Sequence, residues 1–150
     1  MGTGGSTSGL VPSLLAAVAG EEAMAFRLSA DAAALRYGCL RDRLLGVVRQ
    51  DRRHARLLLD AACQRQGEPP QPAGALPGAH DARPAPPFLR LQEDREAKLT
   101  RAARYRELGH EAEAAGDREA ATLCRALAAE ETRHAQVLLD LLAATDPYHN

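Results

Sequence analysis

The chain has 150 residues, of which 45 % are hydrophobic and 26 % are charged, and its formal net charge is −1. This composition fits one globular domain. It excludes a membrane-spanning chain, since no apolar run is long enough, and a dedicated nucleic-acid-binding protein, which would carry a basic excess. Aromatic residues make up only 3 %, whereas the strong helix formers Ala, Leu, Arg and Glu dominate, so we expect an all-α fold.

The cysteines indicate a reducing compartment. Cys39, Cys63 and Cys124 are isolated and odd in number, so no Cys-x-x-Cys pair exists and a four-cysteine iron or zinc centre is excluded. No charged-then-apolar signal peptide opens the sequence. We therefore expect a cytoplasmic protein that partners neither a membrane nor a nucleic acid.

Two helices are predicted in the first half of the chain. Residues 1–11 are rich in Gly and Ser and are interpreted as a flexible tail. Apolar residues at three- and four-residue spacing then predict a helix over residues 12–36. We expect Gly38 to end this first helix in a left-handed conformation. The same periodicity predicts a second helix over residues 39–66.

The second half repeats this arrangement after a proline-rich segment. Residues 67–87 contain seven of the nine prolines, a density that excludes helix and central strand and predicts a loop. Helices follow over residues 87–115 and 118–145, and residues 146–150 form a tail. A link of ~20 residues can run the ~40 Å length of a helix. Residues 12–145 are therefore predicted to form a ferritin-like four-helix bundle with one long crossover between helices two and three.

An acid stands three residues before a histidine on two of the apolar seams. The pairs are Asp51/His54 and Glu131/His134, and this spacing puts both side chains of a pair on one helix face. Spacing alone is a weak signal, since two further pairs occur in the chain. The position of both pairs on the apolar face of a helix is stronger evidence, because ionised groups buried there require a partner ion or a metal. An interhelical ion pair with an arginine such as Arg53 is the alternative.

Register supports convergence of these groups. Glu21 precedes Gly38 by about as many residues as His54 follows it, so both fall at one height in an antiparallel hairpin. Counting from Gly116 in the same way puts the partner of Glu131 near residue 101.

Three segments resemble the helices of rubrerythrin-type, ferritin-like dimetal proteins. They are AVAGEEAM (17–24), QDRRHARLL (50–58) and GDREAATLCRALAAEETRHAQVLLDLL (116–142). In those families, helices one and three each provide Glu, and helices two and four each provide Glu-x-x-His. The resemblance implies that the metal ligands include Glu21, Asp51, His54, Glu131 and His134.

The chain departs from the family pattern at two places. Asp51 stands where the family has Glu, and the helix-three Glu positions align without a gap to Thr100 and Ala103. Glu96, about one turn from the expected height, is the candidate ligand from helix three. The rubredoxin segment of full rubrerythrins is not found in this sequence, so electrons would come from another protein or from the substrate.

Carboxylate and imidazole ligands suit iron or manganese. The resemblance implies two iron ions per chain, with manganese or a single metal as alternatives, and a peroxidase or ferroxidase type of oxidoreductase that reacts with O₂, H₂O₂ or Fe²⁺. A dimetal oxygenase of a small metabolite and a metal-free bundle with a structural or partner-binding role remain the other hypotheses. We expect an external electron donor and a homodimer rather than a cage. No catalytic residue is assigned.

Overall fold

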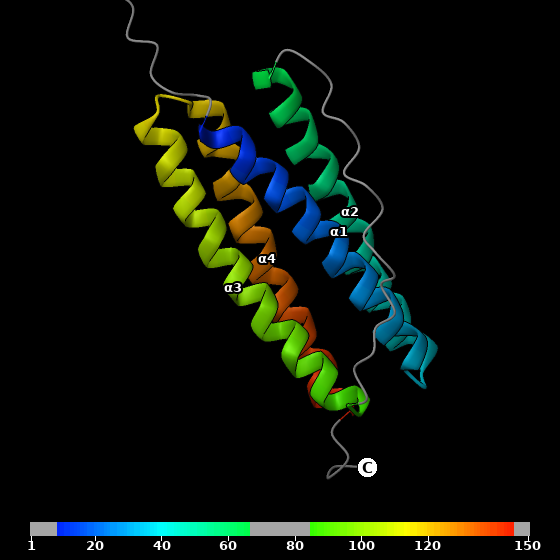
Figure 1. The fold of residues 1–150 in the computed structure, drawn as a ribbon. Coiled ribbons are helices and arrows are strands. Elements are labelled where there is room, and N and C mark those ends of the chain that lie inside the picture. The colour runs from blue at the N-terminus through cyan, green and yellow to red at the C-terminus, as the bar shows by residue number, and fades with distance from the viewer. Residues whose placement is uncertain (1–8, 67–84, 146–150) are drawn as a thin grey trace, which may run out of the picture.

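Four α-helices make up the regular structure of the residues that can be described (Figure 1). The computed structural model describes residues 9–66 and 85–145, and no strand occurs among them. The helices are α1 (Leu10–Ala34), α2 (Gly38–Gln66), α3 (Pro87–Ala114) and α4 (Arg118–Thr145). The all-α prediction is confirmed. Most of the predicted 1–11 tail and of the 67–87 loop, and the whole 146–150 tail, lie outside the described residues.

The helices form two hairpins that lie side by side. α1 packs along α2, and α3 packs along α4. Figure 1 shows α2 and α3 running in the same direction, so Gln66 and Pro87 lie at opposite ends of the bundle. Parallel second and third helices, each packed against its own hairpin partner, are the helix arrangement of the ferritin-like bundle. The predicted fold class is confirmed.

Two helix boundaries differ from the sequence-based prediction. α1 begins at Leu10 and includes Pro12, because the first turn of a helix has free N–H groups and tolerates proline there. Leu10 and Val11, expected in the tail, are buried. Gly38 is the first residue of α2 and does not have a positive φ. The chain leaves α1 instead through Leu35, which is extended at φ −74° and ψ 132°.

The turn between α3 and α4 is held by a cap and an ion pair. Gly116 adopts the left-handed conformation, with φ +78°, which closes α3. The next residue, Asp117, accepts a hydrogen bond from the Ala120 N–H at 3.0 Å and so caps α4. Both of its oxygens also pair with Arg65 of α2, at 2.5 Å and 2.8 Å, and this pair holds the pKa of Asp117 below its usual value.

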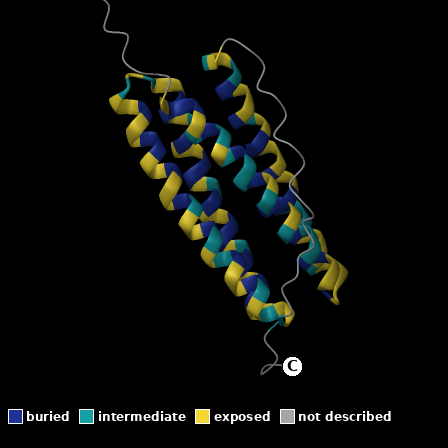
Figure 2. Cartoon of the chain, in the orientation of Figure 1, coloured by how far each residue is buried: buried dark blue, intermediate teal, exposed yellow. Residues whose placement is uncertain are grey.

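All four helices carry buried residues along their length (Figure 2). These residues form two apolar clusters separated by a polar layer. One cluster contains Leu14, Leu58 and Leu108, and the other contains Leu28 and Leu138. Each helix passes from one cluster to the other and carries buried charged or imidazole groups at the crossing point. Those of the polar layer are Glu21, Asp51, His54, Lys98, Glu131 and His134. In the part of the chain that the structure describes, no helix is long and apolar enough to span a bilayer.

Candidate metal centre

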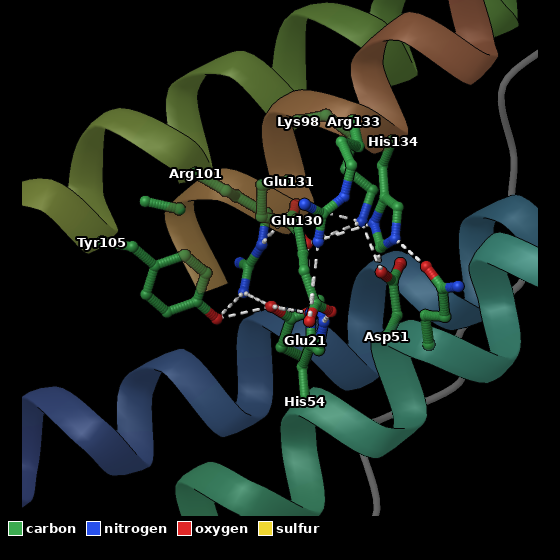
Figure 3. Close-up of polar contacts among 12 residues, drawn as sticks. Glu21, Asp51, His54, Lys98, Arg101, Tyr105, Glu130, Glu131, Arg133 and His134 are labelled. Carbon is green, nitrogen blue, oxygen red and sulfur yellow. Dashed lines mark hydrogen bonds and ion pairs between the residues drawn. The ribbon is translucent and has the colours of Figure 1, made fainter. Parts of the chain in front are cut away.

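Carboxylates and imidazoles from three helices meet in the polar layer (Figure 3). α1 contributes Glu21, α2 contributes Asp51 and His54, and α4 contributes Glu131 and His134, all of them buried. One ligand atom from each of Glu21, Asp51, His54 and Glu131 lies within 4.8 Å of the other three. The structure therefore brings together five of the six residues predicted from the sequence.

The Nδ1 atoms of both histidines face carboxylate oxygens. His54 Nδ1 lies 3.5 Å from Glu21 Oε1 and 3.3 Å from Glu131 Oε1. His134 Nδ1 lies 3.3 Å from Asp51 Oδ1 and 3.4 Å from Glu131 Oε1. The two rings stack with their centroids 5.5 Å apart. Glu131 thus stands between the two halves of the cluster.

The outer nitrogens of the two rings are held by residues that the sequence analysis did not identify. His54 Nε2 lies 2.5 Å from Glu130 Oε2, and His134 Nε2 contacts Gln50 Oε1. Each acceptor directly precedes the acid of the opposite helix, in the segments QDRRH and EETRH. When the ring is neutral, an acceptor beside Nε2 keeps the ring proton on Nε2. The free electron pair of the ring is then on Nδ1. The shared polar residue before each acid is the signal that could have revealed them.

Helix α3 contributes cations to the cluster. Lys98 Nζ lies 2.5 Å from Asp51 Oδ1 and 3.0 Å from Glu131 Oε2. Arg101 Nη2 lies 3.0 Å from Glu21 Oε1. Lys98 was not among the residues predicted from the sequence, although it is the single lysine of the chain. Its place on the buried stripe of α3 is the signal that could have found it; that stripe reads Leu91, Asp94, Lys98, Ala102 and Tyr105.

The prediction of Glu96 as the helix-three ligand is wrong. Glu96 is exposed, as are Thr100 and Ala103. The gapless alignment was two residues out of register, because Lys98 and Arg101, with the same three-residue spacing, face the carboxylates instead. Side chains two residues apart on a helix point to different faces, so a shift of two selects the wrong side of α3.

Tyr105 completes the surroundings of Glu21. Its hydroxyl donates a hydrogen bond to Glu21 Oε1 at 2.5 Å and accepts one from Arg101 Nη2 at 3.0 Å. Burial and the charge of Glu21 raise the pKa of Tyr105 above its usual value. The phenol is therefore protonated and acts as a donor to the carboxylate at neutral pH.

Neighbouring charges in the layer shift the pKa values of its buried groups. Burial alone would lower the pKa of His54, but the nearby carboxylates of Glu131 and Glu21 and the hydrogen bond with Glu130 outweigh it and raise that pKa to about 10. Burial opposes ionisation of Glu131, but contacts with His134 and His54 and the charge of Lys98 lower its pKa. Without a metal, protons on the imidazoles therefore balance part of the carboxylate charge.

Whether these residues fit a metal ion can be judged from the buried polar atoms that have no hydrogen-bond partner. They include Glu21 Oε2, Asp51 Oδ2, His54 Nδ1 and His134 Nδ1. A buried polar atom left unsatisfied costs free energy, and all four lie on side chains of the cluster. Oxygen and imidazole nitrogen form a donor set for iron or manganese. The residues fit a bound metal ion.

The family model described as Rubrerythrin matches residues 13–142. The chain belongs to the rubrerythrin family. Among curated proteins and among solved structures, nothing matches it. Family membership and the buried carboxylate–imidazole group together indicate a site of the dimetal type. This rubrerythrin-family chain differs from the pattern of its family at α3, which brings Lys98 and Arg101 to the carboxylates.

Proposed function

We propose that this rubrerythrin-family protein is an iron-dependent oxidoreductase of the peroxidase or ferroxidase type, reacting with O₂, H₂O₂ or Fe²⁺. One observation carries the proposal: two imidazole Nδ1 atoms face three buried carboxylates, with the Nε2 atoms fixed from behind. When bound, iron supplies reversible one-electron redox chemistry. An external protein supplies the electrons, and a homodimer is the proposed assembly.

The residues of the chain have separate tasks in this proposal. Glu21, Asp51, His54 and Glu131 hold the metal. Glu130 orients the His54 ring through Nε2, and such outer contacts tune a ligand's basicity. Burial of the layer between two apolar clusters excludes bulk water, which strengthens every charge interaction within it.

A small cavity supports a small substrate. It has a volume of about 150 Å³ and lies between α1 and α3, with Ala17, Arg101, Tyr105 and Leu108 in its lining. Arg101 and Tyr105 also contact Glu21, so the cavity reaches the edge of the polar layer. Pockets for drug-sized ligands are usually ~300 Å³ or more. A cavity of this size holds O₂ or H₂O₂, which supports a peroxidase or ferroxidase.

The metal-free bundle is the second candidate function. Lys98 and Arg101 support it, because they pair directly with the carboxylates that would bind metal. They do not satisfy the whole cluster, since Glu21 Oε2, Asp51 Oδ2 and both Nδ1 atoms have no hydrogen-bond partner. A structural or partner-binding role would leave that cost without compensation.

Metal analysis of protein from iron-supplemented cells tests the proposal. We expect bound iron, loss of that iron in His54→Ala, and peroxide consumption that needs a reductant but no organic substrate. His110→Ala is the matched control, because His110 is an exposed imidazole on α3 outside the cluster. Protein that contains no metal and does not bind Fe²⁺ or Mn²⁺ would favour the metal-free bundle.

A further inference from the structure

The polar layer has two halves that share Glu131. In the first half, Glu21 and His54 face Glu131, with His54 Nδ1 3.3–3.5 Å from both carboxylates. In the second half, Asp51 and His134 face it, with His134 Nδ1 3.3–3.4 Å from both. A dimetal site would place one ion in each half.

The ammonium group of Lys98 stands in the second half. Its Nζ contacts Asp51 Oδ1 at 2.5 Å and Glu131 Oε2 at 3.0 Å, the same two carboxylates that His134 Nδ1 faces. The Lys98 side chain is fully buried, so the ammonium is enclosed in the layer and is not a solvated charge at its edge.

The two halves differ in what stands between their ligand atoms. Glu21 Oε2 and His54 Nδ1 of the first half have no hydrogen-bond partner, and neither do Asp51 Oδ2 and His134 Nδ1 of the second. In the first half, Arg101 and Tyr105 both contact Glu21 at Oε1 only, whereas in the second half the Lys98 ammonium bridges the two carboxylates. The four residues whose ligand atoms lie within 4.8 Å of one another are Glu21, Asp51, His54 and Glu131, and His134 is not among them.

The fixed charges leave room for one divalent ion. Glu21, Asp51 and Glu131 face the two cations Lys98 and Arg101. Glu130, at the edge of the layer, has the exposed Arg133 3.8 Å away and is balanced by it. The five inner groups have one negative charge in excess, which one divalent ion turns into one positive charge. A second ion would leave three uncompensated positive charges in a buried layer, and burying unpaired charge is strongly unfavourable.

We infer that Lys98 permanently takes the place of one metal ion, so that the chain binds a single ion, held by Glu21, His54 and Glu131 with Asp51 in reach. This inference rests on the proposed metal-binding function. His134 faces the ammonium side of the layer and is a positioning residue for Asp51 and Glu131.

Metal stoichiometry tests the inference on the full chain. Purified metal-free protein is titrated anaerobically with Fe²⁺, and separately with Mn²⁺, and the ion retained after desalting is counted by elemental analysis. We expect one ion per chain. Two ions would overturn the inference and leave the proposed function standing, whereas none would overturn both.

Two pairs of variants assign the place of the ion. Lys98→Met, of similar length and uncharged, is expected to raise the stoichiometry from one to two, and Lys98→Arg to keep it at one. His54→Ala is expected to abolish retention, while His134→Ala retains one ion. A folded Lys98→Met that stays at one ion would show that the ammonium does not exclude a second. If Lys98→Met fails to fold, loss of the ion in His134→Ala and its retention in His54→Ala would overturn the placement.

Discussion

Gly20 occupies the point where α1 and Arg101 meet. A Cβ atom added at Gly20 would overlap the Arg101 guanidinium, which crosses α1 to reach Glu21 and the carbonyl of Ala17. Glycine inside a helix costs about 1 kcal/mol relative to alanine. The missing side chain is therefore what lets a cation from α3 contact the buried carboxylate of α1.

We expect Gly20→Ala to lower the free energy of unfolding by about 1 kcal/mol, because losing a charged hydrogen bond outweighs the gain in helix propensity. Gly46→Ala is the matched control, since a Cβ there lies 3.6 Å from Arg49 Nη2, an ordinary contact. That variant should gain up to ~1 kcal/mol. Urea unfolding of both variants measures the difference, and an equal gain in both would contradict the role of Gly20.

The Tyr105 hydroxyl makes a second prediction at this scale. Tyr105→Phe removes the donor to Glu21 Oε1 at 2.5 Å and the acceptor of Arg101. We expect a loss of about 2 kcal/mol in the free energy of unfolding, because a buried carboxylate loses a hydrogen bond. Tyr37→Phe, at an exposed site, is expected to leave stability unchanged. A Tyr105→Phe protein as stable as that control would show that the bond contributes nothing.

At the scale of helices, the sequence was sufficient for element type and order. Apolar spacing, the density of proline in residues 67–87 and the Gly116 break predict where helices lie, and those signals are local. Counting residues from Gly116 also predicted correctly that residue 101 lies level with Glu131 along the bundle. It could not determine which face of α3 is buried, because each residue turns the helix by a large angle and a two-residue error moves a side chain to another face. Thus an acid, Glu96, was chosen where the structure has Lys98 inward.

The ion pair between Arg65 and Asp117, at the start of α4, predicts that stability depends on pH. Arg65 holds the pKa of Asp117 below its unfolded value of 3.8, so the contribution of this pair to stability is present above that value and is lost as pH falls through the folded pKa. We expect Asp117→Asn, which can still cap the helix, to be about 1 kcal/mol less stable than wild type at neutral pH. The difference should shrink below pH 3.8. Urea midpoints from pH 2.5 to pH 7 measure it, and a gap that widens in acid would reverse the assignment.

For the whole molecule, the polar layer is also the seam between two hairpins. Glu21, Asp51 and His54 belong to the α1–α2 hairpin, and Lys98 and Glu131 belong to the α3–α4 hairpin. The pairs of acid and histidine were predictable because two chemically distinctive residues recur at one spacing. The cations that compensate the charge of these pairs were not predictable. They depend on which side chains of two separate hairpins meet, and no single segment of the sequence contains that information.

A metal bound in this seam would connect the two hairpins. Because it would bind the folded state and not the separated hairpins, Fe²⁺ or Mn²⁺ at a hundredfold excess over the dissociation constant should add about 2.7 kcal/mol. For a chain of this size that corresponds to a rise of about 8 °C in Tm. Calorimetry with and without metal measures the rise, and His54→Ala should show none.

Hydrogen exchange should slow in α1 and α2 as well as in α3 and α4, because both hairpins provide ligands to the same ion. Protection confined to α3 and α4 would mean that the ion binds one hairpin only, and the seam would then not be the metal site.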